Sequence, residues 1–428
     1  MNVKTTTKQP NKIRRFQRGI YKAAKISPNR RFAVLYDKVY RKDILQAAWQ
    51  KVRAGGKAAG VDKMTVKHIE YEIGVQNFLE GIENELKNQT YKPQLVRRVN
   101  IPKGNGKTRP LGIPTVKDKV VQMAVKLVIE PLFECDFSDC SYGFRPKRSN
   151  QQAANEVHMI INHNKWIVDV DLKSYFDTIN HDFLMEKLRK RVSDKRILHL
   201  IRQWLKAGIL EQDGSTIQTD CGTPQGGVLS PLLSNIYLHD IDKLWCDNAT
   251  VKLVRFADDM VFMCRSERQA KYVLRKLREQ MEQLKLELNE DKTKICHIRK
   301  GFKFLGFIYK EAHSFSKKRW VRIKFPQPER AIRFQQKVKE YLKAVRLGTP
   351  IRDVVKKLNS KLRGWAQYYK IGNSYKVAEN IAGYVCMQLR LYWRRCKHRK
   401  DIRGTRKWRN SFFYQYNLLY LPTLIKTK

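Results

Sequence analysis

The sequence has little that would place it in a membrane or in an oxidising compartment. No apolar stretch approaches the roughly 18 residues needed to span a bilayer, and no apolar segment follows the basic N-terminus, as it would in a secretory signal. The eight cysteines form neither a CxxC pair nor a Cys/His tetrad. A structural zinc site is therefore not expected, and we predict a cytoplasmic protein with no membrane partner and with free, mostly buried thiols.

Acidic residues are scarce and unevenly placed. The 428 residues include 87 Lys and Arg but only 40 Asp and Glu, which gives a formal net charge of +47. Residues 1–60 hold 16 basic residues and 2 acids, residues 301–428 hold 32 and 6, and the stretch between them holds 39 and 32. Because a merely solvated surface would spread its charge evenly, this pattern indicates a near-neutral catalytic body between surfaces that bind a polyanion. Aromatic residues among the basic ones suit stacking on nucleic-acid bases.

The chain is long enough for two or three domains, and 42% of its residues are hydrophobic. Apolar periodicity predicts helices over 30–56, over 120–133, from a Ser266 cap onward, and over 331–345. Short apolar runs predict strands at 166–172, a hairpin of KLVRF and MVFMC, extended chain over 301–310, and a turn at 103–110 between two extended pieces. Strands and helices therefore mix up to about residue 312, and helices dominate beyond it.

Two acids stand side by side in the largely apolar run VRFADDMVFM, at Asp258 and Asp259. Burying a carboxylate costs several kcal/mol unless something pairs with it, so either a hairpin turn or a bound cation must explain them. A third acid, Asp171, ends another apolar strand, with Asp169 on the same face. Three carboxylates on neighbouring strands of a basic protein suggest a site for two Mg²⁺ ions about 3.5–4 Å apart that catalyses phosphoryl transfer.

Longer motifs surround these acids. In chain order they are GKAAGVDKMT, RPLGIPTVKDKVVQMAVKLVIEPLFE, SYGFRPKRS, DVDLKSYFDTINH, TPQGGVLSPLLSNIYL, FADD, NEDKTKI, FKFLGF and LNSKLRGWAQYYKIG. In this order they resemble the sequence boxes of the reverse transcriptases encoded by group II introns, whose catalytic box is of the YADD type. The resemblance covers roughly residues 35–400. It implies an α+β fold of the right-hand polymerase type, with fingers, palm and a helical thumb or maturase domain.

The resemblance also implies a domain order. It gives a basic N-terminal extension over 1–65, fingers and palm over 66–312, a helical thumb or maturase (X) domain over 313–400, and a basic nucleic-acid-binding tail over 401–428. The tail is too short for the Cys-paired endonuclease that some relatives carry, so no endonuclease domain is expected. The catalytic box departs from the family at Phe256, where Tyr is usual, but both acids are intact and activity is expected.

Carried over by motif, the catalytic residues are Asp171, Asp258 and Asp259. Asp171 and Asp258 would be the main ligands of two Mg²⁺ ions, and the backbone carbonyl of Leu172 would add a further ligand. Asp259 would be the adjacent palm carboxylate. The family pattern, in which an aromatic pair and a second Asp follow the metal ligand, selects Asp171 over the acid two residues before it.

The same motifs imply a binding site for the incoming nucleotide. Its residues would be Lys103, Arg109, Phe176 and Gln225. The two cations suit a triphosphate, and Phe176 would lie under the sugar, where its ring would clash with a 2′-hydroxyl and favour dNTPs. For Phe176 the alternative is ordinary core packing, for Lys103 and Arg109 a solvated loop. Asp177 is predicted to be structural.

The remaining motifs give the expected contacts with template, primer and RNA. The template and primer residues are Gly226, Gly227, Phe256, Lys292, Phe304, Leu305 and Gly306. The RNA-binding residues are Arg363, Trp365, Tyr368, Tyr369 and Lys370. For Lys292 an anchoring role in the palm is an equal alternative, and for Phe304 and Leu305 a place in the core. The glycines would allow backbone to approach template and nucleotide closely.

The function that the resemblance implies is that of an RNA-directed DNA polymerase encoded by a bacterial group II intron. It would also bind its intron RNA as a maturase that assists splicing and mobility. Its partners would be intron RNA, an RNA template with a DNA primer, dNTPs and a DNA target; its oligomeric state is not predicted. Two alternatives remain, a splicing cofactor with little polymerase activity and a host-recruited reverse transcriptase of phage defence or DNA repair. The intact FADD and PQGG motifs favour the enzyme.

Overall fold

The computed structural model describes residues 11–55, 58–104, 107–316, 318–397 and 408–425. The chain divides into two compact units, each assembled from separate stretches of sequence. Unit 1 comprises Met1–Arg148, Val170–Met260 and Tyr272–Thr293; unit 2 comprises Ser149–Asp169, Val261–Lys271 and Lys294–Lys428. In the described part of the chain, no helix is long and apolar enough to cross a membrane.

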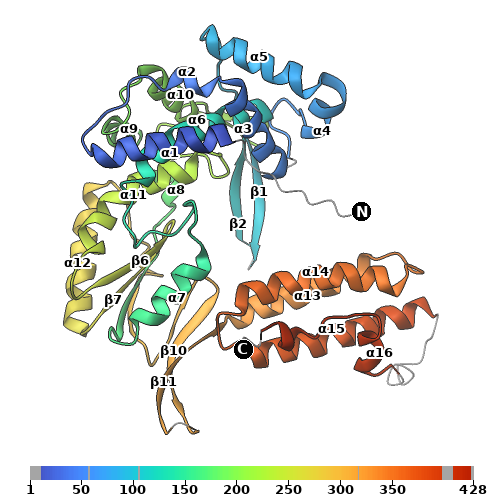
Figure 1. The fold of residues 1–428 in the computed structure, drawn as a ribbon. Helices are drawn as coiled ribbons and strands as arrows, with labels where there is room; N and C mark the ends of the chain where they lie inside the picture. The colour runs from blue at the N-terminus through green and yellow to red at the C-terminus, as the bar shows by residue number, and fades with distance from the viewer. Residues whose placement is uncertain (1–10, 56–57, 105–106, 317, 398–407, 426–428) are drawn as a thin grey trace. The chain divides into compact units, whose positions relative to one another are not determined.

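Helices make up most of unit 1 (Figure 1). They are α1 (Asn11–Ile26), α2 (Tyr36–Val39), α3 (Lys42–Gly55), α4 (Val66–His68), the π-helix η1 (Ile69–Ile73), α5 (Val75–Lys87), α6 (Val116–Glu134), α8 (Tyr175–Thr178), α9 (His181–Arg189), α10 (Lys195–Leu205) and α11 (Ser230–Cys246). The buried helix α6 is the centre of this unit, and α1, α2 and α3 pack against it. It begins at a Thr115 cap, whose hydroxyl accepts a hydrogen bond from the Asp118 N–H.

A small sheet of unit 1 has the strand order β2-β1-β4-β5. Its strands are β1 (Val96–Gly104), β2 (Lys107–Ile113), β4 (Ile209–Leu210) and β5 (Thr216–Ile217). The first two form the long hairpin visible in Figure 1, with Ile101 opposite Arg109. This pairing confirms the two extended pieces, but most of the turn predicted over 103–110 is strand, and Arg109 lies on the second strand.

A second sheet has the strand order β6-β7-β3-β8. The strands are β6 (Lys252–Phe256), β7 (Asp259–Cys264), β3 (Trp166–Val170) and β8 (Lys294–His297). The helix α7 (Asn150–Ile160) precedes β3 in the chain, and α12 (Glu267–Gln283) follows β7. The predicted hairpin of KLVRF and MVFMC is therefore confirmed. The predicted cap of α12 is confirmed as well, since the Ser266 hydroxyl accepts a hydrogen bond from the Gln269 N–H at 3.2 Å.

The C-terminal part of unit 2 is a three-stranded sheet followed by helices. The strands β9 (Phe302–Phe304), β10 (Phe307–Ser314) and β11 (Arg319–Pro326) lie in the order β11-β10-β9. The helices are α13 (Pro328–Ala344), α14 (Ile351–Tyr369), α15 (Tyr375–Cys396), α16 (Asn410–Tyr414) and the 3-10 helix η3 (Leu421–Leu424). α13 packs on α15, and η3 packs on both α14 and α15 (Figure 1).

Several expectations need correction. The helix predicted over 30–56 is two helices, α2 and α3, because the chain breaks at Tyr40 and Arg41. Val34, inside the predicted range, lies outside both helices and is 68% exposed. The helical part of unit 2 begins at Pro328 rather than near 312, because β11 comes first. All eight cysteines are free thiols, but four of them are buried, fewer than expected.

The end of the chain contributes to the core of unit 2. Phe413 of α16 and Leu421 of η3 are fully buried, and the Asn359 amide of α14 donates to the carbonyl of Asn417 at 2.7 Å. The predicted nucleic-acid-binding tail over 401–428 therefore has a packed portion. Residues 401–407 and 426–428 lie outside the described part of the chain.

Candidate active site

The turn between β6 and β7 carries Asp258 and Asp259. Ala257 begins the turn with a φ of 59°, the left-handed conformation that costs a residue with a Cβ about 1–2 kcal/mol. Arg255 offsets this cost, because its Nη1 donates to the Ala257 carbonyl at 3.0 Å. The turn thus presents Asp258, which is half-buried, and Asp259, which is exposed and begins β7.

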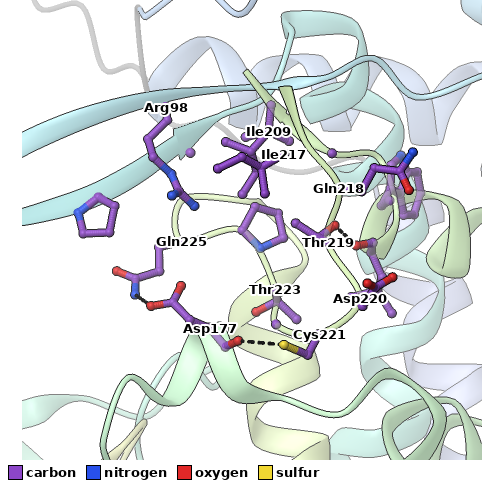
Figure 2. A pocket seen from close by; sticks show the side chains of 18 residues that line it. Arg98, Asp177, Ile209, Ile217, Gln218, Thr219, Asp220, Cys221, Thr223 and Gln225 are labelled. Atoms are coloured by element: carbon purple, nitrogen blue, oxygen red, sulfur yellow. Dashed lines mark hydrogen bonds between the residues drawn. The ribbon is translucent and has the colours of Figure 1, made fainter. Parts of the chain in front are cut away.

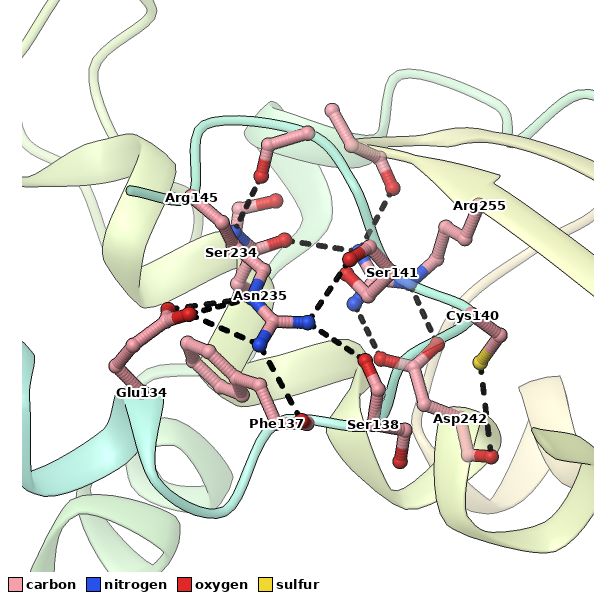
Figure 3. Close-up of polar contacts among 12 residues, drawn as sticks. Glu134, Phe137, Ser138, Cys140, Ser141, Arg145, Ser234, Asn235, Asp242 and Arg255 are labelled. Atoms are coloured by element: carbon pink, nitrogen blue, oxygen red, sulfur yellow. Dashed lines mark hydrogen bonds and ion pairs between the residues drawn. The ribbon is translucent and has the colours of Figure 1, made fainter. Parts of the chain in front are cut away.

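Arg255 itself is fully buried and is held from α11. Its Nε donates to Asp242 Oδ1 at 2.7 Å, its Nη2 forms an ion pair with the other oxygen of that carboxylate, and its Nη1 donates to Asn235 Oδ1 at 2.9 Å. The Asp242 side chain is also fully buried. A buried charge is tolerated only when it is paired and hydrogen-bonded, and this pair meets both conditions (Figure 3). The sequence reasoning missed it, although a lone Arg in the apolar strand KLVRF signals a buried partner.

The motif SYGFRP closes the other side of the turn. A Cβ on Gly143 would meet the Ala257 nitrogen at 2.3 Å, so only glycine allows this approach. The Asn235 amide donates to the Gly143 carbonyl at 2.8 Å, which links the motif to the same buried network. Two residues on, the buried Arg145 forms an ion pair with Glu134 and donates to the carbonyls of Ser138 and Ser141 (Figure 3). This motif therefore serves to fix the position of the acidic turn.

Asp171 lies directly after β3, on chain that the NEDKTKI segment holds. The Asp171 N–H donates to the Thr293 hydroxyl at 3.3 Å, and its carbonyl accepts from the Asn289 N–H at 2.8 Å. The next residue, Leu172, bridges Leu288. The ammonium group of Lys292 donates to both carboxylate oxygens of Asp171, at 3.1 and 3.2 Å. Both alternatives for Lys292 thus have support, since it contacts a predicted catalytic acid from an anchoring segment.

The carboxylates of Asp171 and Asp258 lie close enough to interact. Burial raises the pKa of Asp258, the positive charge of Arg109 lowers it, and the negative charge of Asp171 raises it. Asp169, the acid that periodicity could not separate from Asp171, pairs across the strands with Lys294 instead. In the described residues, no group of three His, Cys, Asp or Glu is placed to hold a metal ion. The acids therefore form a pair with an ammonium and a guanidinium beside them, rather than a dedicated cage.

Arg109 is exposed and is oriented by a short chain of hydrogen bonds. Its Nε donates to Gln225 Oε1 at 2.8 Å, and the Gln225 amide in turn donates to Asp177 at 3.5 Å. Gln225 is also fixed through its backbone, since its carbonyl accepts from the Gly112 N–H at 2.6 Å. These contacts bring together two of the predicted nucleotide-binding residues and give Asp177 a structural role. The side chain of Lys103 lies outside the described part of the structure.

Phe176 is buried, at 9% exposure, beside this group. Its ring meets the Tyr175 ring edge-on with centroids 5.2 Å apart, and its carbonyl accepts from the Thr223 N–H at 2.6 Å. These contacts support the core-packing alternative without testing a role under a sugar. A cavity of about 270 Å³ opens between the small sheet and the 217–225 loop, with Asp177 and Gln225 in its wall (Figure 2).

The two glycines after Gln225 have structural causes of their own. Gly226 has a φ of 110°, and a Cβ there would meet the Gly112 carbonyl oxygen at 2.4 Å. A Cβ on Gly227 would meet the Ser230 hydroxyl at 2.6 Å. The backbone of β2 therefore requires glycine at 226, whereas at 227 a Cβ would only force the Ser230 hydroxyl to move.

The FKFLGF motif forms a two-residue turn between β9 and β10. Leu305 and Gly306 have φ values of 47° and 78°, the pair of positive values that a tight hairpin turn demands. The Tyr368 hydroxyl of α14 donates to the Leu305 carbonyl at 3.0 Å. Phe304 is buried, which supports the core alternative for that ring.

The structure corrects part of the predicted RNA-binding set on α14. Trp365 and Tyr369 are 6% and 7% exposed, and their rings pack on each other with centroids 4.8 Å apart. They form the core of unit 2, so neither ring is presented to a base. Arg363 is exposed, whereas Tyr368 and Lys370 are half-buried. The alternation arises because a helix that packs on one side buries only one of its faces.

Two family descriptions and several known proteins match this chain. Residues 101–309 match the family described as reverse transcriptase (RNA-dependent DNA polymerase), and residues 331–412 match the group II intron maturase-specific domain. The protein YkfC of Escherichia coli (strain K12) is 36% identical over 291 residues, which cover 59% of this chain and 76% of YkfC. The group II intron-encoded protein LtrA of Lactococcus lactis subsp. cremoris is 29% identical over 436 residues, covering 80% of this chain and 71% of LtrA.

A search of solved structures gives a weaker likeness. A chain of a partial Cas6-RT-Cas1–Cas2 complex aligns with a TM-score of 0.37 and 20% sequence identity. The alignment covers 58% of this chain and 42% of that one.

Proposed function

The chain belongs to the family of reverse transcriptases and maturases encoded by group II introns. We propose a role for individual residues within that function. The chain has a right-hand polymerase fold and is an RNA-directed DNA polymerase with a maturase domain. The catalytic residues we assign are Asp171 and Asp258, with Asp259 beside them. The observation that carries the assignment is the interaction of two carboxylates from distant segments at a turn fixed by buried Arg255.

Enzymes of this family use divalent cations, and the residues of the site suit such an ion. Two neighbouring carboxylates, one with its pKa raised by burial, favour a cation between them. The ammonium group of Lys292, a cation carried by the chain itself, already contacts the Asp171 carboxylate. Mg²⁺ prefers one or two carboxylates completed by water and phosphate oxygens, so the lack of a third acid ligand among the described residues is no obstacle. Asp171, Asp258 and the Leu172 carbonyl would hold Mg²⁺, and we propose two ions.

The reaction joins the primer 3′-oxygen to the α-phosphorus of a dNTP and releases pyrophosphate. Bound Mg²⁺ would lower the pKa of the 3′-hydroxyl and stabilise charge on the phosphoryl oxygens. The exposed guanidinium of Arg109, which Gln225 holds in place, binds the triphosphate because its positive charge is opposite to the negative charge of the phosphates. The ring of Phe176 restricts the space at the sugar of the incoming nucleotide. Its position is fixed by the Tyr175 ring and by the hydrogen bond between the Thr223 N–H and the Phe176 carbonyl. The chain's own residues therefore bind and orient the reactants.

Maturase action requires no further chemistry of the protein. Intron RNA binds through phosphate contacts to the basic C-terminal region, so the affinity should fall steeply with salt. The exposed Arg363 and the half-buried Lys370 of α14 are the members of the predicted set that we retain for this contact, with Tyr368 as a support of the turn at Leu305. A DNA target and a DNA primer on RNA template are proposed as further partners.

The assignment of the metal-binding acid can be tested by comparing two carboxylates of one strand segment. Asp171→Asn should lower primer extension on an RNA template by at least about a thousandfold, because the loss removes a catalytic ligand. Asp169→Asn, which changes the acid opposite Lys294, should leave extension within a few-fold. RNA binding measured by filter retention should be retained in both. Robust extension by Asp171→Asn, or equal loss in the two variants, would contradict the assignment.

A further inference from the structure

The β10–β11 hairpin of unit 2 carries an exposed aromatic and cationic surface that the active site does not use. Phe315 is 88% exposed and Trp320 is 48% exposed, the former being the most exposed large hydrophobic side chain in the described residues. Around them lie Arg299 and His313, and we call these four residues the tip surface. Large apolar rings are kept in water only at a cost, so a cluster of them marks an interaction site.

The register of the hairpin puts these groups on one face. His313 lies opposite Trp320, Glu311 opposite Arg322, and Tyr309 opposite Lys324, so all six side chains share a side of the ribbon. Near the base this face is covered by α7, since the Tyr309 hydroxyl donates to the Ala154 carbonyl at 3.2 Å. Towards the tip the cover ends (Figure 1) and the rings of His313 and Trp320 are exposed.

The rings of the tip surface are already arranged for stacking. The His313 ring meets those of Trp320 and Phe315 edge-on, with centroids 5.7 and 5.3 Å apart. The Arg299 guanidinium lies over the Trp320 ring, 4.8 Å from its centroid. This packing fixes the orientation of Trp320 and leaves about half of its surface in water. Ordered, exposed aromatic rings with a guanidinium beside them form a stacking platform for bases.

The charge around the tip surface has one sign. Residues 294–326 contain ten Lys and Arg and a single acid, Glu311. That acid is 1% exposed and is shared by Lys165 at 3.5 Å, Arg299 at 3.4 Å and Arg322 at 3.6 Å. One buried carboxylate thus positions three cations, which leaves the group with a net positive charge toward solvent. The partner that fits has regularly spaced negative charges and flat rings between them.

We propose that the tip surface binds an unpaired segment of RNA, with bases stacked on Phe315 and Trp320 and phosphates near Arg299 and Arg322. A duplex fits less well, because its bases are already stacked on each other and offer no free ring face. A lipid surface fits less well too, since Val, Ile and Leu do not occur between Ala312 and Trp320. The proposal rests on the maturase function proposed above and names a surface that would bind the RNA. It does not depend on the polymerase site.

The test measures the affinity of the full chain for a short, unstructured RNA by fluorescence anisotropy. An excess of blunt RNA–DNA hybrid is added to occupy the polymerase site. The double variant Phe315→Ala/Trp320→Ala should bind the single strand at least tenfold more weakly, and Phe315→Tyr/Trp320→Phe should retain most of the affinity, because rings remain. The matched control is Tyr71→Ala, which removes a ring that is 82% exposed between Glu70 and Glu72; it should change nothing.

Two further measurements decide between the possible outcomes. A photoreactive single-stranded RNA containing 4-thiouridine should crosslink to the peptide that carries Phe315 and Trp320. Primer extension on a preformed short template–primer should stay within about twofold in the double alanine variant, so that loss of RNA binding is distinguished from failure of the active site. The proposal would be overturned if the double alanine variant kept its affinity for single-stranded RNA, lost affinity equally for duplex RNA, or lost affinity only for single-stranded DNA. Crosslinks found only in other peptides would also overturn it.

Discussion

Two turns in this chain hold their backbones in the left-handed region by different means. The turn of β6 and β7 places Ala257 at a φ of 59°, and a buried guanidinium, that of Arg255, donates to its carbonyl. The turn of β9 and β10 places Leu305 at a φ of 47°, and a neutral phenol, that of Tyr368, donates to its carbonyl. The first support is ionic and fully buried, and the second is neutral and half-buried.

The difference follows from what each turn has to present. The first turn carries two acids, and a carboxylate whose pKa is raised by burial needs positive charge nearby to remain ionised. Arg109 supplies the larger part of that charge, and Arg255 adds a smaller part from within the core while it holds the backbone in place. The second turn carries Leu and Gly, which need no counter-charge. Its support can therefore be a single uncharged side chain from α14.

The largest expected effect comes from breaking the ionic support. Arg255→Met should lower the free energy of unfolding by about 3–5 kcal/mol, because the carboxyl group of Asp242 would be left buried without its partner. Thermal unfolding of the full chain would measure this loss. Primer extension at a temperature where the variant is still folded should also fall, since the Ala257 carbonyl loses its donor.

A double variant separates stability from positioning. Arg255→Met/Asp242→Leu removes both charges and should recover most of the stability, because apolar replacements of a buried pair are often neutral. Activity should stay low, since the turn still lacks its donor. If activity returned together with stability, Arg255 would have no positioning role.

An intermediate effect concerns how the folding stability depends on pH through a histidine of α11, the helix that carries Asp242 and Asn235. Burial, together with the positive charge of nearby Lys243, lowers the pKa of His239 on this helix to about 4. The unfolded chain, with an ordinary pKa near 6.5, therefore binds the proton first as the pH falls. Stability is full above about pH 6.5 and is lost down to about pH 4, by roughly 3 kcal/mol for this one group.

His239→Phe should remove that part of the pH dependence. The variant keeps a ring beside Phe137, with which the His239 ring makes an edge-on contact. The comparison is the thermal midpoint of both proteins between pH 7.5 and pH 4.5, and the gap between wild type and variant should change in favour of the variant as the pH falls. Parallel curves would mean that His239 does not titrate in this range.

The smallest effect is expected at the neutral support. Tyr368→Phe deletes the hydrogen bond to the Leu305 carbonyl and a contact with Asn150, and should cost about 1 kcal/mol. The loss should be independent of pH between 5 and 8, because burial raises the pKa of this phenol and keeps it neutral. A cost as large as that of Arg255→Met would erase the distinction between the two turns.

The comparison also marks what the sequence could predict. Local sequence patterns were sufficient to predict the hairpin around FADD, the buried helix α6 and the Ser266 cap. The pair of Arg255 and Asp242 could not be found in this way, since the partners lie 13 residues apart on different elements. Only the tertiary fold decides which buried charges meet.

Aromatic residues were the least predictable part. Trp365 and Tyr369 in LRGWAQYYK have the same basic neighbours as an RNA-binding segment, yet the helix turns both rings inward. Phe315 and Trp320 drew no attention in the sequence, because neither belongs to a motif, yet they are exposed. Composition predicts that rings and cations occur together, whereas the direction of each ring depends on packing.

Lys292 gives this chain a counterion that cannot diffuse away. An ammonium carried on the same polypeptide balances Asp171 without the entropy loss of capturing a dissolved ion. One of the two neighbouring negative charges is thereby balanced by the chain itself.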